Sequence, residues 1–286
     1  MRTPALFSNK GKEMNLFKGK TAIVTGGASG IGLALCEQLS EQGAKVTIAD
    51  INKEGAESAE KKILASGGTA QAAYLDVTSS EAVQGLIDKT VAEQGQLDYM
   101  FNNAGIAIQG EARDMTPEHW DRILKINLLS VIYGTTAAYQ KMVEQGAGHI
   151  VNTASILGLI GLGLSVGYAT TKHAIVGLST SLRAEGAGLG VKVSVVCPGF
   201  VQTGLYNAAT IVEADNKEFY DQVPFKRMDV NKAAKLIIKG VRRNKAIMVF
   251  PLHAKLMWWG LRFNQNALDK ANYFAMRDFR KIRKEQ

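Results

Sequence analysis

Tyr168 and Lys172 lie four residues apart in Tyr-Ala-Thr-Thr-Lys, thirteen residues after Ser155. On a helix this spacing places both side chains on one face, so the Lys172 ammonium would lie near the Tyr168 phenol. To act as a base at neutral pH, a phenol needs a pKa about 3 units below its usual value of about 10, which corresponds to about 4 kcal/mol. One ammonium together with the positive ring of a cofactor could supply that energy. The three residues predict a proton-transfer centre, although a Tyr and a Lys also meet at this spacing by chance.

A glycine-rich segment at residues 25–32, Thr-Gly-Gly-Ala-Ser-Gly-Ile-Gly, predicts a phosphate-binding loop. It follows a strand-like run at 20–25 and opens a segment whose apolar residues recur at helical spacing. Glycines there let the backbone approach a pyrophosphate, whose charge is favoured by the amides of the helix N-terminus. A second strand at 45–49 ends in Asp50, which can accept hydrogen bonds from ribose hydroxyls. These two strands and the loop predict a dinucleotide site.

The full set of motifs resembles the short-chain dehydrogenase/reductase family in its compact, single-domain form, over residues 16–251. The glycine spacing Gly-x-x-x-Gly-x-Gly is that of this family and differs from the Gly-x-Gly-x-x-Gly of larger dehydrogenases. The motifs occur in the family's order: Thr25-Gly-x-x-x-Gly30-Ile31-Gly32, Asp76, Asn102-Asn103-Ala104-Gly105, Asn127, Ser155, Tyr168 with Lys172, Pro198-Gly199 and Thr203. The resemblance implies a Rossmann-type α/β fold, with a doubly wound, mainly parallel, seven-stranded sheet in the order 3-2-1-4-5-6-7 and helices on both faces.

The alternation of strand-like and helical segments also predicts a mainly parallel sheet. The strand-like segments lie at 20–25, 45–49, 70–75, 97–102, 148–154, 191–197 and 246–250. A chain of 286 residues, 46% of them hydrophobic, suffices for one such domain with a large core. We therefore expect a Rossmann-fold dehydrogenase domain at 16–251. A disordered N-terminal extension at 1–15 and a basic, amphipathic helical extension at 252–286 would flank it.

The resemblance implies roles for the four catalytic positions. Tyr168 would be the acid/base, and Ser155 would hydrogen-bond the substrate oxygen and steady its developing charge. Lys172 would bind the nicotinamide ribose and lower the pKa of the phenol. Asn127, in a long helix expected at 117–146, would support a water that relays protons from Lys172 to solvent. Without the resemblance, Asn127 would be interpreted as an amide that packs between helices.

The resemblance also implies the cofactor contacts. The residues expected to bind the dinucleotide are Gly26, Ser29, Gly30, Ile31, Gly32, Asp50, Ile51, Asp76, Val77, Asn103, Ala104, Gly105, Tyr168, Lys172, Pro198, Gly199, Val201 and Thr203. A carboxylate at Asp50 repels a 2′-phosphate and is satisfied by ribose hydroxyls, so we expect NAD rather than NADP. Ser29, Ile51 and Asn52 supply no cation for that phosphate, although Lys53 lies nearby in the sequence.

Three variable segments would form the substrate pocket, at 105–112, 156–167 and 204–228. The second is apolar and glycine-rich, and the third, with Tyr206, Phe219, Tyr220 and Phe225, is expected to be a helical lid. Walls without an obvious Arg or Lys partner favour a hydrophobic alcohol or ketone over a sugar phosphate. The same segments are also compatible with an ordinary apolar core.

Several functions are compatible with these motifs. We expect an NAD(H)-dependent alcohol dehydrogenase or carbonyl reductase. An NADP-dependent carbonyl reductase and a catalytically silent nucleotide sensor on the same fold are the alternatives. An epimerase or dehydratase of the related extended family would have a different glycine spacing and a substantial C-terminal substrate domain.

The composition of the chain argues against nucleic acids and metal ions as binding partners. The net charge is +8, but five basic and one acidic residue lie within 1–20, and eight basic and two acidic residues lie within 255–284. The remaining body is close to neutral, which argues against nucleic-acid binding. Two cysteines and four histidines show no disulfide or zinc spacing, so we expect no metal and two buried thiols. Without an apparent secretory signal or membrane span, the cytoplasm is the expected location.

The C-terminal extension leaves alternatives open. Its Trp258-Trp259 pair and basic residues suit an anionic membrane surface, whereas a helix that caps the pocket or packs on another subunit would have the same pattern. The family resemblance implies a homodimer or homotetramer, formed by the helices expected at 117–146 and 168–186.

Overall fold

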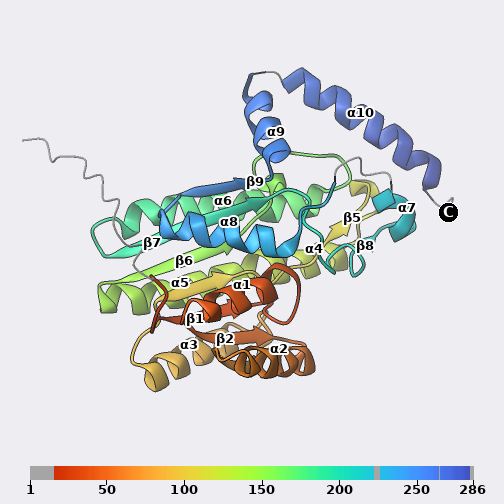
Figure 1. Ribbon diagram of the computed structural model, residues 1–286. Helices are drawn as coiled ribbons and strands as arrows, with labels where there is room; N and C mark the ends of the chain where they lie inside the picture. Colours follow the sequence, from red (N-terminus) through yellow and green to blue (C-terminus); the bar gives the residue numbers. More distant parts are fainter. Residues whose placement is uncertain (1–15, 222–225, 264, 284–286) are drawn as a thin grey trace, which may run out of the picture.

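The computed structural model describes residues 16–221, 226–263 and 265–283. At its centre lies a seven-stranded sheet in the order β3-β2-β1-β4-β6-β7-β9, and all neighbouring strands are parallel (Figure 1). The strands are β1 (Thr21–Thr25), β2 (Lys45–Asp50), β3 (Thr69–Tyr74), β4 (Tyr99–Asn102), β6 (Gly148–Thr153), β7 (Val191–Pro198) and β9 (Ile247–Phe250). Since β6, β7 and β9 are the fifth to seventh strands of this sheet, the predicted order is confirmed.

Helices cover both faces of the sheet. They are α1 (Gly30–Glu41), α2 (Lys53–Ala65), α3 (Ser80–Gln94), α4 (Pro117–Leu124), α5 (Ser130–Gln145), α6 (Val166–Gly186) and α8 (Val230–Arg242). Successive strand residues point to opposite faces. Ala22 and Val24 pack in the apolar layer with α1 and α8, and Ile23 packs in the layer with α3 and α5. The doubly wound architecture is confirmed.

A buried polar network joins the centre of the sheet to two helices. The Asn102 Nδ2 atom donates to Asn152 Oδ1 at 2.9 Å, and Asn152 Nδ2 donates to Ser179 Oγ at 3.0 Å. Thr135 Oγ1 also donates to Asn152 Oδ1, at 3.1 Å. All four side chains are buried, so each depends on the others for its hydrogen bonds. The network fixes α6, which carries Tyr168, against β6, which precedes Ser155.

Two predicted elements differ from the structure. The long helix expected at 117–146 is interrupted by a π-helical turn at Lys125–Leu129, which lies between α4 and α5. The lid expected at 204–228 is only partly helical. It contains β8 (Thr210–Ile211), paired with β5 (Ile108–Gln109), and the short helix α7 (Asn216–Asp221). Residues 222–225, with Phe225, lie outside the described residues, as does the extension expected at 1–15.

The C-terminal segment forms α9 (Leu252–Phe263) and α10 (Gln265–Ile282). Figure 1 shows α10 leaving α9 and extending toward α7 and the β5–β8 pair. Phe279 on α10 is 1% exposed and packs with Leu164 and Ala214. Two bidentate ion pairs join the same end of α10 to the body, from Arg280 and Arg283 to Glu111 and Asp114. Across the described residues, no helix combines the length and the apolar character needed to cross a membrane.

Candidate active site

One cavity of about 1340 Å³ runs along the carboxyl edge of the sheet, from the glycine loop to α10. Eighteen of the predicted site residues line it: Gly26, Ser29, Gly30, Ile31, Asp50, Ile51, Asp76, Val77, Asn103, Ala104, Gly105, Ser155, Tyr168, Lys172, Pro198, Gly199, Val201 and Thr203. Gly32 and Asn127, both buried, lie behind its wall. The structure therefore brings residues from both halves of the sequence to one site.

The glycine loop depends on close backbone contacts. Gly26 has a φ of +65°, and a Cβ there would lie 2.9 Å from Ala104 Cα. A Cβ at Gly32 would overlap the carbonyl of Gly26. Any larger residue at either position would push the loop away from α1 or from the strand-end loop after β4. Gly32 thus supports the predicted pyrophosphate site by packing rather than by facing the cavity.

The N-terminus of α1 is free to bind an anion. Ser29 occupies the N-cap position, yet its side chain makes no capping hydrogen bond, and the first turn of α1 contains no acidic residue. By contrast, α2, α3 and α8 are capped by the side chains of Asn52, Ser79 and Asp229. Amides at a helix N-terminus attract negative charge. This part of the cavity fits a dinucleotide pyrophosphate.

Asp50 lies at the end of β2, where the cavity would accommodate an adenosine ribose. Its Oδ2 accepts from the Ala28 amide at 3.0 Å and its Oδ1 accepts from the Asn52 amide at 2.9 Å. Each oxygen retains capacity for another hydrogen bond. Lys53, the nearest cation in the sequence, is directed toward Glu57 at 3.8 Å. The local charge therefore disfavours a 2′-phosphate.

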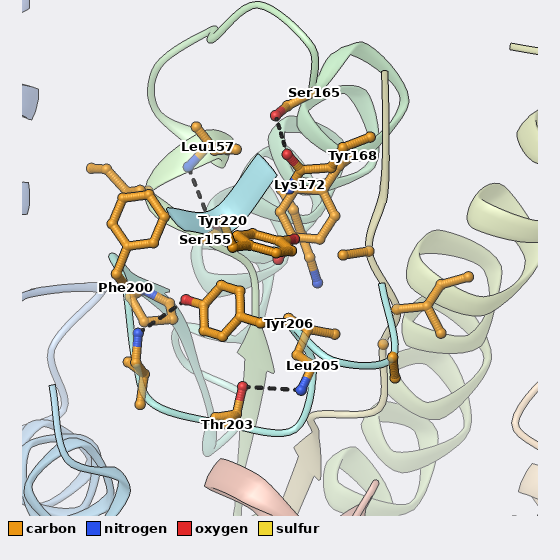
Figure 2. Close-up of a pocket in the computed structure, with 18 of the residues that line it drawn as sticks. Ser155, Leu157, Ser165, Tyr168, Lys172, Phe200, Thr203, Leu205, Tyr206 and Tyr220 are labelled. Carbon is orange, nitrogen blue, oxygen red and sulfur yellow. Dashed lines mark hydrogen bonds between the residues drawn. The ribbon is translucent and has the colours of Figure 1, made fainter. Parts of the chain in front are cut away.

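Ser155, Tyr168 and Lys172 converge where the nucleotide end of the cavity meets its apolar end (Figure 2). Ser155 Oγ accepts from the Leu157 amide at 3.2 Å, which orients the hydroxyl. Lys172 Nζ donates to the Thr153 carbonyl at 3.0 Å and lies 5.5 Å from the centre of the Tyr168 ring. Tyr168 and Lys172 lie on α6, as their spacing predicts.

Burial dominates the protonation of this pair. It raises the pKa of the Tyr168 phenol well above its usual range, and the hydrogen bond with Ser155 opposes that effect. Burial also lowers the pKa of Lys172 to about 8. In the cofactor-free protein the net effect on the phenol pKa is therefore upward, and the lowering of this pKa by Lys172 and a bound cofactor stays a prediction.

Asn127 has a contact that the sequence did not reveal. Its Oδ1 accepts from the Ile106 amide at 2.8 Å, and its Nδ2 donates to the Ile106 carbonyl at 2.9 Å. A Cβ at Gly105 would lie 3.2 Å from Asn127 Oδ1 and 3.6 Å from Lys172 Nζ. The side chain therefore holds the loop that faces Lys172. The π-helical turn positions Asn127 for this contact.

Other residues in and around the cavity make contacts that the sequence did not reveal. Thr25 Oγ1 accepts from the amides of Asn103 and Ala104 at 3.0 and 3.1 Å, and so orders that part of the cofactor wall. The substrate end is closed by α10, through residues that include Ala275, Phe279 and Ile282. Their helical spacing indicated an apolar face, but only the tertiary structure shows that this face lines the cavity.

The family model described as short chain dehydrogenase matches residues 20–214. The chain belongs to this family of oxidoreductases. It is 34% identical to the cyclohexanol dehydrogenase of Acinetobacter sp. (strain SE19), over 75% of this chain and 84% of that protein. It is 37% identical to the D-threitol dehydrogenase of Mycolicibacterium smegmatis, over 67% of this chain and 74% of that protein. The structure is similar to that of a short-chain dehydrogenase/reductase from Burkholderia phymatum in complex with NAD. The TM-score is 0.76 and the identity 27%, over 82% of this chain and 89% of that one.

Titration of Lys172 should make stability depend on pH. The pKa of Lys172 is about 8 when folded, against an ordinary value of 10.5, so between these values the unfolded chain binds more protons. The free energy of unfolding should therefore rise with pH in this window, by about 2 kcal/mol between pH 8 and about pH 10, relative to Lys172→Met. Below pH 8 the difference between the two proteins should be constant.

Urea unfolding of the cofactor-free proteins, followed by circular dichroism at several pH values, measures this difference. Taking the difference between the two proteins cancels the ionisation of every other group. If the difference in free energy of unfolding between the two proteins does not change with pH, the lowered pKa of Lys172 is contradicted.

Proposed function

We propose that the protein is an NAD(H)-dependent oxidoreductase that interconverts an alcohol and its carbonyl, acting on an apolar substrate. The observation that carries this proposal is the position of Ser155, Tyr168 and Lys172. They lie between the part of the cavity lined by the glycine loop and Asp50 and a part whose walls are largely apolar. A silent nucleotide sensor would not need the three polar groups at that junction.

The protein groups would handle the proton while a bound NAD supplies the hydride acceptor. In alcohol oxidation, the Tyr168 phenolate would take the hydroxyl proton as the adjacent C–H bond gives up its hydride. Ser155 would donate a hydrogen bond to the same oxygen. Because burial alone raises the phenol pKa, the phenolate needs positive charge nearby. Lys172 and the oxidised nicotinamide ring would supply it.

Proton exchange with solvent would pass from Tyr168 toward Lys172. The Asn127 side chain already binds the backbone of Ile106, so we assign it the positioning of the loop beside Lys172. The water that the family resemblance implies would then rest on backbone atoms of this region.

Removing the Tyr168 hydroxyl should abolish turnover without preventing cofactor binding. For Tyr168→Phe we expect kcat to fall by about 100-fold or more, the usual contribution of general acid–base catalysis. Formation of NADH across hydrophobic and polar alcohols measures kcat, and quenching of protein fluorescence measures NADH affinity. Tyr74→Phe, which removes an exposed and distant hydroxyl, is the control. Tight NAD binding by the wild type without turnover of any alcohol would instead favour the sensor.

Asp50 supports NAD over NADP as the cofactor. Its carboxylate faces the cavity, is anchored by two backbone amides and has no cation paired with it among the described residues. An NADP-dependent carbonyl reductase would need a positive group near this point.

The wild type should use NAD with a kcat/KM at least about 10-fold higher than NADP, a difference of about 1.4 kcal/mol. Asp50→Ala should shrink this ratio, since it removes both the ribose acceptor and the repulsion. Asp76→Ala should weaken the use of both cofactors alike, because Asp76 lies at the predicted adenine position. Equal efficiency of the wild type with both cofactors would contradict the proposal.

The apolar half of the cavity supports a hydrophobic alcohol or ketone. Much of its wall is formed by apolar side chains such as Leu157, Leu162, Leu164, Phe219, Phe279 and Ile282. The expectation of walls without an Arg or Lys was wrong, because Arg277 and Lys281 of α10 also line the cavity. The relatives are named for a cyclic alcohol and for a polyol, so the names of relatives do not select a substrate. The argument rests on this chain's own walls.

We also propose a homodimer or homotetramer in the cytoplasm. The outer surfaces of α5 and α6 include exposed Thr136, Thr170 and Thr180, whose hydroxyls bond within their own helices. Small exposed residues such as these suit close helix pairing between subunits. Size-exclusion chromatography with light scattering would measure the assembly.

One face of α9 supports peripheral contact with an anionic membrane. Leu252, Leu256 and Trp259 are 69%, 62% and 63% exposed, and with Lys255 they follow the spacing of a single helix face. Exposed apolar residues beside basic ones suit the boundary of an anionic bilayer. This contact is compatible with the lining of the cavity, because α9 lines the cavity through His253, Ala254 and Met257, which lie on the opposite face of the helix.

Vesicle sedimentation would test this contact. We expect phosphatidylcholine vesicles containing phosphatidylglycerol to retain the wild type, and Leu256→Ser/Trp259→Ser to weaken partitioning by about 10-fold or more through lost apolar burial. Leu64→Ser/Leu236→Ser, which removes exposed apolar residues from the body, is the matched control. Equal retention of both double variants would contradict the contact.

A further inference from the structure

Tyr220 carries a buried hydroxyl with no hydrogen-bond partner among the described residues. The residue lies on α7, is 6% exposed and lines the cavity. Its neighbour Tyr206 differs, because its hydroxyl accepts a hydrogen bond from the Val201 amide at 3.2 Å. Buried polar groups are nearly always paired, so an unpaired hydroxyl on a residue that lines a cavity points to a partner supplied by a ligand.

Packing holds the Tyr220 ring in this orientation. The ring meets Tyr206 edge-on at 4.9 Å between centroids, and it meets Phe219 edge-on at 5.0 Å. The Arg227 guanidinium lies 4.6 Å from the Tyr206 ring and 5.9 Å from the Tyr220 ring. Phe219 in turn packs on Phe279 of α10 at 6.0 Å. The hydroxyl is therefore directed by a rigid aromatic cluster and not by a partner of its own.

The hydroxyl lies in the same part of the cavity as the catalytic phenol. Figure 2 shows Tyr168, Tyr206 and Tyr220 gathered around one space, with Ser155 beside them. Burial, with the added effects of Tyr206 and Tyr168, raises the pKa of Tyr220 above its usual range. At neutral pH Tyr220 thus keeps its proton and can donate it in a hydrogen bond. It is close enough to Tyr168 for the two phenols to interact electrostatically.

We propose that Tyr220 hydrogen-bonds a second oxygen of the substrate, and that the enzyme prefers an apolar alcohol or ketone with another hydroxyl or carbonyl near the reacting carbon. The inference rests on the proposed alcohol–carbonyl function and sharpens its substrate class. Ser155 and Tyr168 would hydrogen-bond the reacting oxygen, and Tyr220 would hydrogen-bond the second oxygen. A buried donor that finds an acceptor only in such substrates rejects analogues that lack it.

Matched substrates isolate this contact. Cyclohexanol and the 1,2- and 1,3-cyclohexanediols share one ring and differ only in the second hydroxyl. They are compared with NAD as co-substrate for the wild type, Tyr220→Phe and Tyr206→Phe. The Tyr220 variant removes one oxygen and retains the ring that packs in the cluster. The Tyr206 variant removes a hydroxyl that already has a protein partner.

The wild type should use at least one diol with a kcat/KM about 10-fold higher than that for cyclohexanol, and Tyr220→Phe should remove that advantage. Tyr206→Phe should retain the ratio between the substrates. A wild type that uses cyclohexanol as well as the diols, or an unchanged ratio in Tyr220→Phe, would overturn the proposal. So would an equal loss of the ratio in both variants.

Stability and binding measurements separate this inference from the proposed function. In the free protein, Tyr220→Phe should raise the melting temperature and Tyr206→Phe should lower it, because only the second loses a hydrogen bond. If no alcohol yields NADH, the proposed function fails. The inference is then decided by the shift in melting temperature that a diol produces in the NAD-loaded protein. A diol shift that disappears in Tyr220→Phe would support it, whereas an unchanged or absent shift would overturn it.

Discussion

The active site is organised around the cost of burying two ionisable groups side by side. Tyr168 and Lys172 are both enclosed by the protein, and desolvation disfavours the charged form of each. Neither group can act without partners that offset this cost. The Thr153 carbonyl holds the ammonium, and Ser155 holds the phenol. In the proposed mechanism a bound cofactor would supply the remaining positive charge, so proton transfer would depend on cofactor binding.

The partners of Tyr168 and Lys172 must be held in fixed positions, because they come from a different element of the fold. Tyr168 and Lys172 belong to α6, whereas Ser155 and Thr153 follow or end β6. The buried network through Asn152 and Ser179 ties these two elements together. On the other side, Asn127 binds the loop at Ile106, so a single π-helical turn positions the wall that faces Lys172. Polar networks with every member satisfied rigidify a core, and here they do so directly behind the reacting groups.

Much of the fold could be predicted from the sequence because its signals are local. The strands, the glycine loop and the four-residue spacing of Tyr168 and Lys172 depend on residues within one or two turns of each other. The direction of the Tyr168 pKa could not be predicted, because it depends on burial by distant segments. The bond between the Asn127 side chain and Ile106, twenty-one residues away, also could not be predicted, because it depends on the tertiary structure. The interruption of the helix expected at 117–146 likewise has no signal in hydrophobic periodicity.

The apolar part of the cavity is held together differently from the part that contains Ser155, Tyr168 and Lys172. Its walls come from four segments distant in sequence, at 105–112, 156–167, 204–228 and the C-terminal helices, which are joined by long-range contacts rather than by the sheet. Glu111, only 6% exposed, receives Arg280 from α10, and the ion pair lowers the pKa of that carboxyl. Phe279 of α10 then packs on Phe219, which orients Tyr220. A charge removed at Glu111 would leave Arg280 without its partner and loosen the aromatic cluster. The C-terminal helix, outside the family's matched region, thereby contributes to the shape of the cavity beside the proposed catalytic residues.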